Sequence, residues 1–129
     1  MRSEEFLNNH QKDRIDRIKD FIRWAIDVLE LQKPYPKITL SNRTGAAREG
    51  HHTGVNTPHE NHIWVYVGNR NLIDIFRTIF HELTHAKQHQ IGLIQPGDSY
   101  PGSPIEMEAD AMAGKYIKIY VRDHPDIIE

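Results

Sequence analysis

The residues that could do chemistry gather in one short segment of the chain, His81-Glu82-Leu83-Thr84-His85. Positions i and i+4 of a helix lie one turn apart on the same face, so two imidazoles at this spacing can bind one metal ion. A glutamate directly after the first histidine can reach a water on that metal, which is the position of a general base. The H-E-x-x-H pattern therefore predicts a zinc site with His81 and His85 as ligands and Glu82 as the catalytic base.

The opposite side of the same helix is apolar, and this indicates which way the two histidines face. Residues turn by about 100° around a helix axis, and the apolar stripe comprises Leu72, Phe76, Ile79 and Leu83. His81 and His85 lie on roughly the other side, so we expect them to face a cleft or solvent and not the core. Because the chain holds nine histidines, the pattern can also arise by chance, and a solvated helix face stays open as the alternative.

A catalytic zinc site needs a third protein ligand, and a later predicted helix (residues 103–122) offers three carboxylates for it. Glu106 and Asp110 lie toward one edge of the apolar arc of that helix, whereas Glu108 lies on its solvated side. We therefore expect Glu106 to bind the metal and Asp110 to accept a hydrogen bond from a ligating histidine, which fixes the tautomer of that ring. The alternative for Glu106 is a capping box, in which its carboxylate bonds back to the Ser103 amide.

Several other residues could contact a substrate. Tyr100 lies on the loop before the third ligand and could donate to an oxyanion, although packing on the loop explains it equally well. His89 could donate to substrate, but we favour a solvated position for it. If residues 63–67 form an edge strand that pairs with an extended peptide, Trp64 and Tyr66 could line the cleft, and ordinary sheet packing is the alternative. The remaining candidates could polarise a substrate carbonyl or lie on the surface: His51, His52, His59 and His62.

The elements that must position these residues form an α+β fold within one domain, residues 1–129. Apolar residues recur at helical spacing in the helices, and they alternate in the strands. The predicted order is a helix (residues 4–31), three short strands that form a small antiparallel sheet (37–40, 52–56 and 62–67) and two further helices (71–91 and 103–122).

Composition narrows the function classes. The formal net charge is −2, which argues against a nucleic-acid binder that neutralises phosphates. There is no cysteine, so disulfides and cysteine-based zinc sites are excluded. Residues 1–13 lack the apolar region of a signal peptide, and no run of about 18 apolar residues exists. We therefore expect a cytoplasmic protein that binds neither nucleic acid nor membrane, and the oligomeric state stays open.

These motifs resemble those of the gluzincin metallopeptidases, in particular the small ImmA/IrrE-like enzymes of phages and mobile elements. In that group the H-E-x-x-H helix is followed by a segment of the type E-x-E-A-N/D-x-x-A, which reads Glu106-Met107-Glu108-Ala109-Asp110-Ala111-Met112-Ala113 here. The resemblance covers roughly residues 37–120. A metzincin is excluded, because it would need glycine and histidine where this chain has Gln88 and Ile91.

The resemblance implies a minimal zincin-like fold that holds one zinc ion per chain through His81, His85 and Glu106. It also implies that Glu82 is the base in the hydrolysis of a protein or peptide substrate. We therefore predict a zinc-dependent metallopeptidase. The alternative is a catalytically silent metallopeptidase-like protein that acts as a protein- or peptide-binding module.

Overall fold

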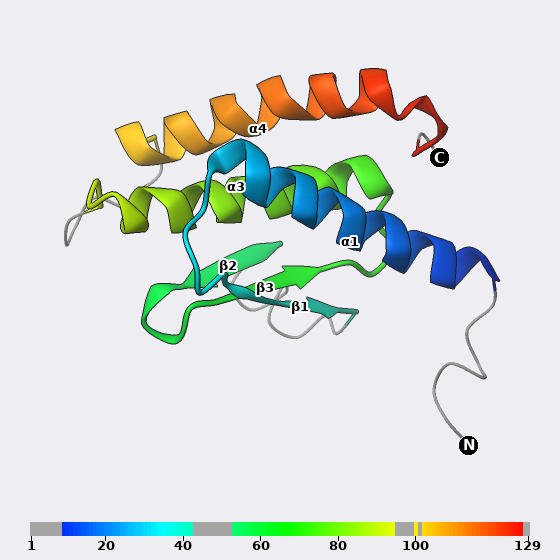
Figure 1. Cartoon of the computed structure of the whole chain (residues 1–129), viewed down its shortest axis with the longest axis horizontal. Coiled ribbons are helices and arrows are strands. Elements are labelled where there is room, and N and C mark those ends of the chain that lie inside the picture. Colours follow the sequence, from blue (N-terminus) through cyan, green and yellow to red (C-terminus); the bar gives the residue numbers. More distant parts are fainter. Residues whose placement is uncertain (1–8, 43–52, 95–99, 101, 128–129) are drawn as a thin grey trace.

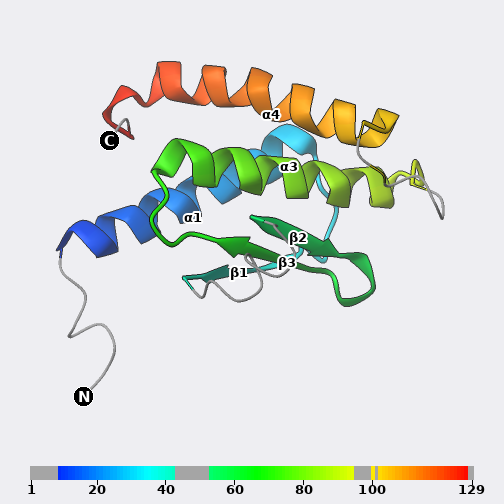
Figure 2. The ribbon, with the colours of Figure 1, turned by 180° about the vertical axis from the view of Figure 1, so that it is seen from behind.

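The computed structural model describes residues 9–42, 53–94, 100 and 102–127. This part of the chain is α+β, as predicted. Its elements are α1 (Asn9–Leu29), β1 (Lys37–Ser41), β2 (Gly54–Thr57), β3 (His62–Tyr66), α3 (Leu72–Gln90) and α4 (Pro104–Asp123), with short 3-10 turns at Pro58–Glu60 and Pro125–Ile127. Figures 1 and 2 show that α3 lies between the sheet and α4, while α1 crosses beside α3. The central helix is thus the one that carries the H-E-x-x-H segment.

The sheet has the order β1-β3-β2 and is mixed, so the prediction of an antiparallel sheet is wrong for one of its two pairings. β2 and β3 form an antiparallel hairpin, but β1 runs parallel to β3, with Lys37 opposite His62. Alternation of apolar residues shows which face of a strand is buried and does not show the direction of its neighbour. The strand order makes β3 the central strand, so the suggestion that residues 63–67 form an edge is also wrong. Among the described strands the edges are β1 and β2.

The apolar core fixes α3 in place from both sides. Ile63 and Val65 of β3 are fully buried, and they lie on the face of the sheet that α3 covers. The Phe76 ring of α3 stacks on Phe21 of α1, with 4.2 Å between ring centroids. Tyr120 of α4 meets Phe76 edge to face at 5.7 Å. One helix is thereby packed against the sheet, α1 and α4 at once.

Capping residues set where α3 and α4 begin. The side chain of Asn71 accepts a hydrogen bond from the Asp74 amide at 2.9 Å, which starts α3 one residue after the predicted position. Ser103 caps α4, and Pro104 occupies its first turn, where a missing amide costs nothing. Gly92, with φ +76°, follows the end of α3 in the left-handed conformation that favours glycine. The helix ends thus follow from local residue types, and they place α3 and α4 as the sequence predicted.

Candidate metal centre

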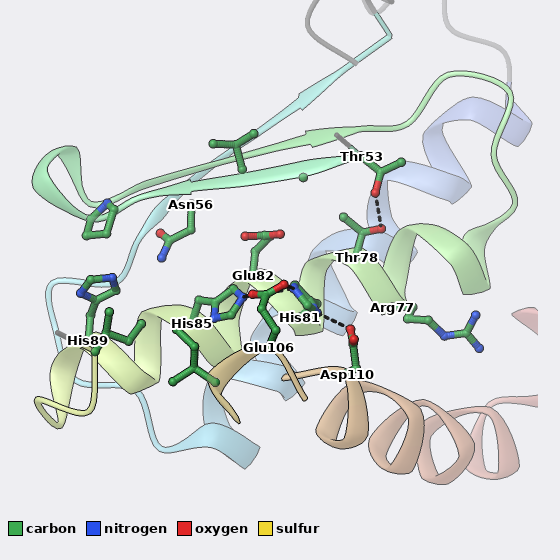
Figure 3. Close-up of a pocket in the computed structure, with 15 residues that line it drawn as sticks. Thr53, Asn56, Arg77, Thr78, His81, Glu82, His85, His89, Glu106 and Asp110 are labelled. Carbon is green, nitrogen blue, oxygen red and sulfur yellow. Dashed lines mark hydrogen bonds and ion pairs between the residues drawn. The ribbon is translucent and has the colours of Figure 1, made fainter. Parts of the chain in front are cut away.

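α3 and α4 bring His81, His85 and Glu106 to one point, where one ligand atom from each lies within 4.8 Å of the others. The two Nε2 atoms of the histidines are 3.1 Å apart, and Glu106 Oε2 lies 3.7 Å from His81 Nε2. The other carboxylate oxygen of Glu106 contacts His85 Nε2 (Figure 3). The side chains are 18%, 11% and 29% exposed in that order, so the group is mostly shielded from solvent. These three residues, grouped in the sequence as candidate ligands, could hold a metal ion.

The outer nitrogens of both imidazoles are committed to acceptors. His81 donates from Nδ1 to Asp110 Oδ1 at 2.9 Å, the contact expected of Asp110 from its position one turn after Glu106. The Nδ1 atom of His85 lies 2.7 Å from the side-chain oxygen of Gln88. When Nδ1 carries the hydrogen of a neutral ring, Nε2 presents a lone pair. Two lone pairs and a carboxylate therefore converge on one point, where a metal cation could bind all three.

Glu106 does not divide its carboxylate between the metal centre and the helix cap. Ser103 Oγ accepts a hydrogen bond from the Glu106 backbone amide at 3.4 Å, which is one half of a capping box. The other half is absent from this described helix start, because the Ser103 amide donates to the Tyr100 carbonyl at 2.9 Å. The carboxylate of Glu106 is left for the histidines, so the structure favours the ligand geometry over the capping alternative.

Glu82 lies next to this group and is 8% exposed. Burial raises the pKa of its carboxyl to about 7; His85 and a hydrogen bond from the Asn56 backbone oppose this rise, and the charge of Glu106 adds to it. Burial likewise lowers the pKa of His81, and the neighbouring His85 lowers it further, while Glu106 and Asp110 act in the opposite direction. Figure 3 shows the Glu82 carboxylate between β2 and the candidate ligands. It is therefore placed to exchange a proton with a group held in the cavity.

β2 passes unusually close above Glu82, and Gly54 makes this possible. A Cβ atom on Gly54 would lie 2.6 Å from Thr78 Cγ2, which is closer than real Cβ contacts come. It would also lie 3.0 Å from Glu82 Cγ, which is tighter than most real Cβ contacts. The sequence reasoning missed this role, although an isolated glycine inside a predicted strand is a known sign of close backbone approach. A single hydrogen atom at this position thus sets the distance between the strand and the candidate base.

A cavity of about 700 Å³ opens in front of the candidate ligands. β2 forms one wall, the polar side of α3 forms the floor, and the first turns of α4 close the far side (Figure 3). Arg77 lines the cavity near one end and His89 near the other, with Ile105 also contributing to the lining. The candidate ligands therefore lie in a groove that is open to solvent.

The sequence reasoning missed the role of Gln88 and the hydrogen bond that Glu108 makes with it. Gln88 is 1% exposed and bonds to His85, whereas its only use in the sequence was to exclude a metzincin. Glu108 is exposed, as expected of a solvated residue, but its Oε1 atom accepts a hydrogen bond from Gln88 Nε2 at 2.9 Å. The available signal was spacing, since positions i and i+3 share a helix face. The hydrogen bond from Gln88 to Glu108 could not be predicted in this way, because it depends on how α3 and α4 pack.

Of the other candidates that the structure describes, His89 alone lines the cavity of the candidate ligands. His89 is exposed but lines the cavity, and partial burial, His85 and His59 all lower its pKa. Tyr100 is 55% exposed, and neither it nor Tyr66 belongs to the described lining of the cavity. Tyr66 stacks on Trp64 on the sheet face away from α3, with ring centroids 6.5 Å apart. The four other histidines that were candidates divide as follows: His59 is exposed, His62 is hydrogen-bonded to Thr39 at 2.7 Å, and His51 and His52 lie outside the described residues.

Comparisons with protein-family models, with curated proteins and with solved structures found no match. None of the described helices combines the length and the apolar character that a membrane crossing requires. The functional interpretation therefore depends on the site itself.

Proposed function

We propose that this chain is a zinc-dependent metallopeptidase with a minimal zincin-like fold. The observation that carries the proposal is the convergence of two imidazole nitrogens and one carboxylate, with the buried Glu82 beside them. Two nitrogens and one oxygen suit zinc, whereas magnesium and calcium favour sites made of oxygen ligands alone. Three protein ligands also leave the open coordination position that distinguishes a catalytic zinc from a structural one.

Glu82 supplies the proton transfers of the proposed reaction. Zinc, when bound, provides the Lewis acidity that lowers the pKa of water and polarises a carbonyl. Glu82 accepts a proton from the water that attacks the scissile carbonyl carbon, and it delivers that proton to the amine nitrogen as the C–N bond breaks. The close approach of β2 and the hydrogen bond from the Asn56 backbone hold the carboxylate in position for both steps.

The outer edge of β2, which pairs with no other described strand, supports the proposal of a peptide substrate. Tyr66 donates from its backbone to the Thr53 carbonyl at 2.9 Å, so Thr53 directs its backbone groups toward β3. In an antiparallel pair this direction alternates, and Gly54 and Asn56 therefore direct theirs toward the free edge. Part of this edge is used within the protein, since the Asn56 backbone bonds to Glu82. The groups that remain can pair with an extended chain laid along the cavity.

Elemental analysis and a peptide-cleavage assay test this proposal together. Purified protein is expected to hold one zinc per chain and to cleave members of a fluorogenic peptide library. Glu82→Gln should keep the zinc and lower cleavage by about 10²- to 10⁴-fold, because it removes the proton acceptor, whereas His81→Ala should lose the zinc as well. Full activity in Glu82→Gln would remove the mechanism. Bound zinc without any cleavage by the unaltered protein would favour the silent binding module instead.

A further inference from the structure

Gln88 lies three residues beyond His85 on α3 and is among the most deeply buried polar side chains of the described residues, at 1% exposed. A buried amide costs free energy unless both of its ends are hydrogen-bonded. Its Nε2 atom donates to the Ile105 carbonyl at 3.0 Å and to Glu108 Oε1 at 2.9 Å. Its Oε1 atom lies 2.7 Å from His85 Nδ1. Both ends of the amide are thus hydrogen-bonded, and its partners are a candidate ligand and two residues of α4.

The partners fix which way round this amide sits. A backbone carbonyl and a carboxylate accept hydrogen bonds and do not donate, so both must face the NH₂ group of Gln88. The amide oxygen is then left for His85, and because an oxygen of this kind only accepts, the ring must carry its hydrogen on Nδ1. The lone pair of His85 Nε2 is thereby directed at the point shared with the other two candidate ligands.

We propose that Gln88 is the positioning residue of the metal centre. It holds His85 in the tautomer and ring orientation that binds a metal ion, and it is itself held by α4, the helix that supplies the third ligand. Because Ile105 directly precedes Glu106, one amide ties the second ligand to the backbone beside the third. This inference depends on the proposed metal site and deepens it.

Asp110, the partner of His81, is more exposed than Gln88, and this difference sets how much the metal affinity should depend on each residue. Asp110, which accepts from His81, has a side chain that is 75% exposed, so a water molecule can take its place when it is removed. Gln88 is shielded from solvent, and an apolar replacement leaves the Nδ1 hydrogen of His85 without an acceptor. The metal affinity should therefore depend more strongly on Gln88 than on Asp110.

Two substitutions of the same residue separate positioning from a structural role. Gln88→Met keeps the length of the side chain and removes its hydrogen bonds, so the zinc affinity should fall about 10- to 100-fold. Gln88→Glu keeps an oxygen that accepts from His85 but loses both donors and places a second carboxylate beside Glu108. Its zinc affinity should stay within about threefold of the unaltered chain, since a carboxylate is a common partner of a zinc-bound histidine. Its resistance to urea should fall, because of the lost donors and the added repulsion.

The matched control is Gln90→Met. Gln90 lies on the same helix and also makes two hydrogen bonds to a distant part of the chain, at 2.8 and 3.0 Å to the Gln32 backbone. It lies outside the lining of the metal cavity, so its loss should leave the zinc affinity unchanged.

Zinc affinity is measured on folded protein by competition with a chromophoric chelator, and stability on zinc-free protein by urea unfolding. Loss of affinity in Gln88→Met with retention in Gln88→Glu supports the proposal. Unchanged affinity in Gln88→Met, or an equal loss in both variants, overturns it. If Gln88→Met does not fold, the exposed Glu108→Ala loosens the same amide and should cost about three- to tenfold in affinity, and no change there overturns it too. An unaltered chain that binds no zinc would instead refute the proposed metal site itself.

Discussion

The two sides of α3 are both largely buried, but they are buried against different neighbours. One side packs apolar residues on the sheet, α1 and α4: Ile75, Phe76, Ile79, Phe80 and Leu83. The other side faces β2 and the first turns of α4 with residues that are polar or ionisable: Thr78, His81, Glu82, His85 and Gln88. Apolar side chains are satisfied by any close packing, whereas each buried polar group needs a partner of a particular kind at a particular distance.

The polar side meets this demand with partners from several elements. Arg70, on the loop before α3, donates to Thr78 Oγ1 at 2.7 Å and to the Tyr66 carbonyl at 2.8 Å, which links the helix to the end of β3. α4 provides Asp110 for His81 and holds Gln88 for His85. The difference between the two sides indicates that the core packing and the proposed metal chemistry depend on separate faces of one helix. Substitutions should therefore separate them.

The largest effect is expected on the apolar side, from Phe76→Ala. Phe76 is fully buried between Phe21 and Tyr120, so the substitution leaves a cavity and should lower the free energy of unfolding by about 3–5 kcal/mol. The zinc affinity of the molecules that remain folded should not change. Urea unfolding in the presence of a chelator measures the first effect, and chelator competition the second.

Leu93→Ala is the control for this prediction, because Leu93 is 50% exposed and its truncation should change the free energy of unfolding by no more than about 0.5 kcal/mol. If Phe76→Ala unfolds outright, Phe76→Leu applies the same test with a smaller cavity. A loss of zinc affinity in folded Phe76→Leu comparable with that of His81→Ala would break the comparison between the two faces.

A smaller effect, confined to catalysis, is expected where β2 meets the polar side. Gly54→Ala forces the strand away from Glu82 and Thr78, since the new Cβ atom would lie 2.6 Å from Thr78 Cγ2. A displacement near 1 Å at an active site can cost about 10²-fold in rate, so peptide cleavage should fall by that order while zinc stays bound.

The chain offers a matched control in Gly114→Ala. Gly114 lies within α4 with nothing within 4 Å of an added Cβ atom, so alanine should leave cleavage unchanged and stabilise the helix by up to about 1 kcal/mol. Equal cleavage by Gly54→Ala and the unaltered chain would show that the close approach of β2 does not position the base.

The sequence predicted those parts of the site that depend on a single element. His81 and His85 share a face because of helix geometry alone, and Glu106 and Asp110 do so for the same reason on the next helix. Capping residues and the spacing of apolar residues also predicted where these helices begin and end, so the order of helices and strands could be predicted from the sequence.

The parts that were missed depend on how elements pack against one another. The parallel pairing of β1 with β3 is set by the path of the chain between the strands, which alternation of residue types does not record. Gln88 acquires its role from Ile105 and Glu108, which lie 17 and 20 residues further along the chain. Gly54 is important because Thr78 and Glu82 of α3 lie directly against it. In each of these three cases the role of a residue or strand depends on which other element packs against it, and residue types along the chain do not record that packing.

The smallest effect on zinc affinity is expected from Asp110→Ala, which compares two residues of the polar site with each other. Asp110 and Gln88 both accept from the outer nitrogen of a candidate ligand, at 2.9 and 2.7 Å, but Asp110 is mostly exposed to solvent. Water can replace its carboxylate, so the zinc affinity should fall by about tenfold, at the lower end of the range for such partners. Asp123→Ala, which removes another exposed carboxylate from α4, should leave the affinity unchanged. A greater loss in Asp110→Ala than in Gln88→Met, measured by chelator competition, would show that charge on the partner outweighs its burial in holding the metal centre.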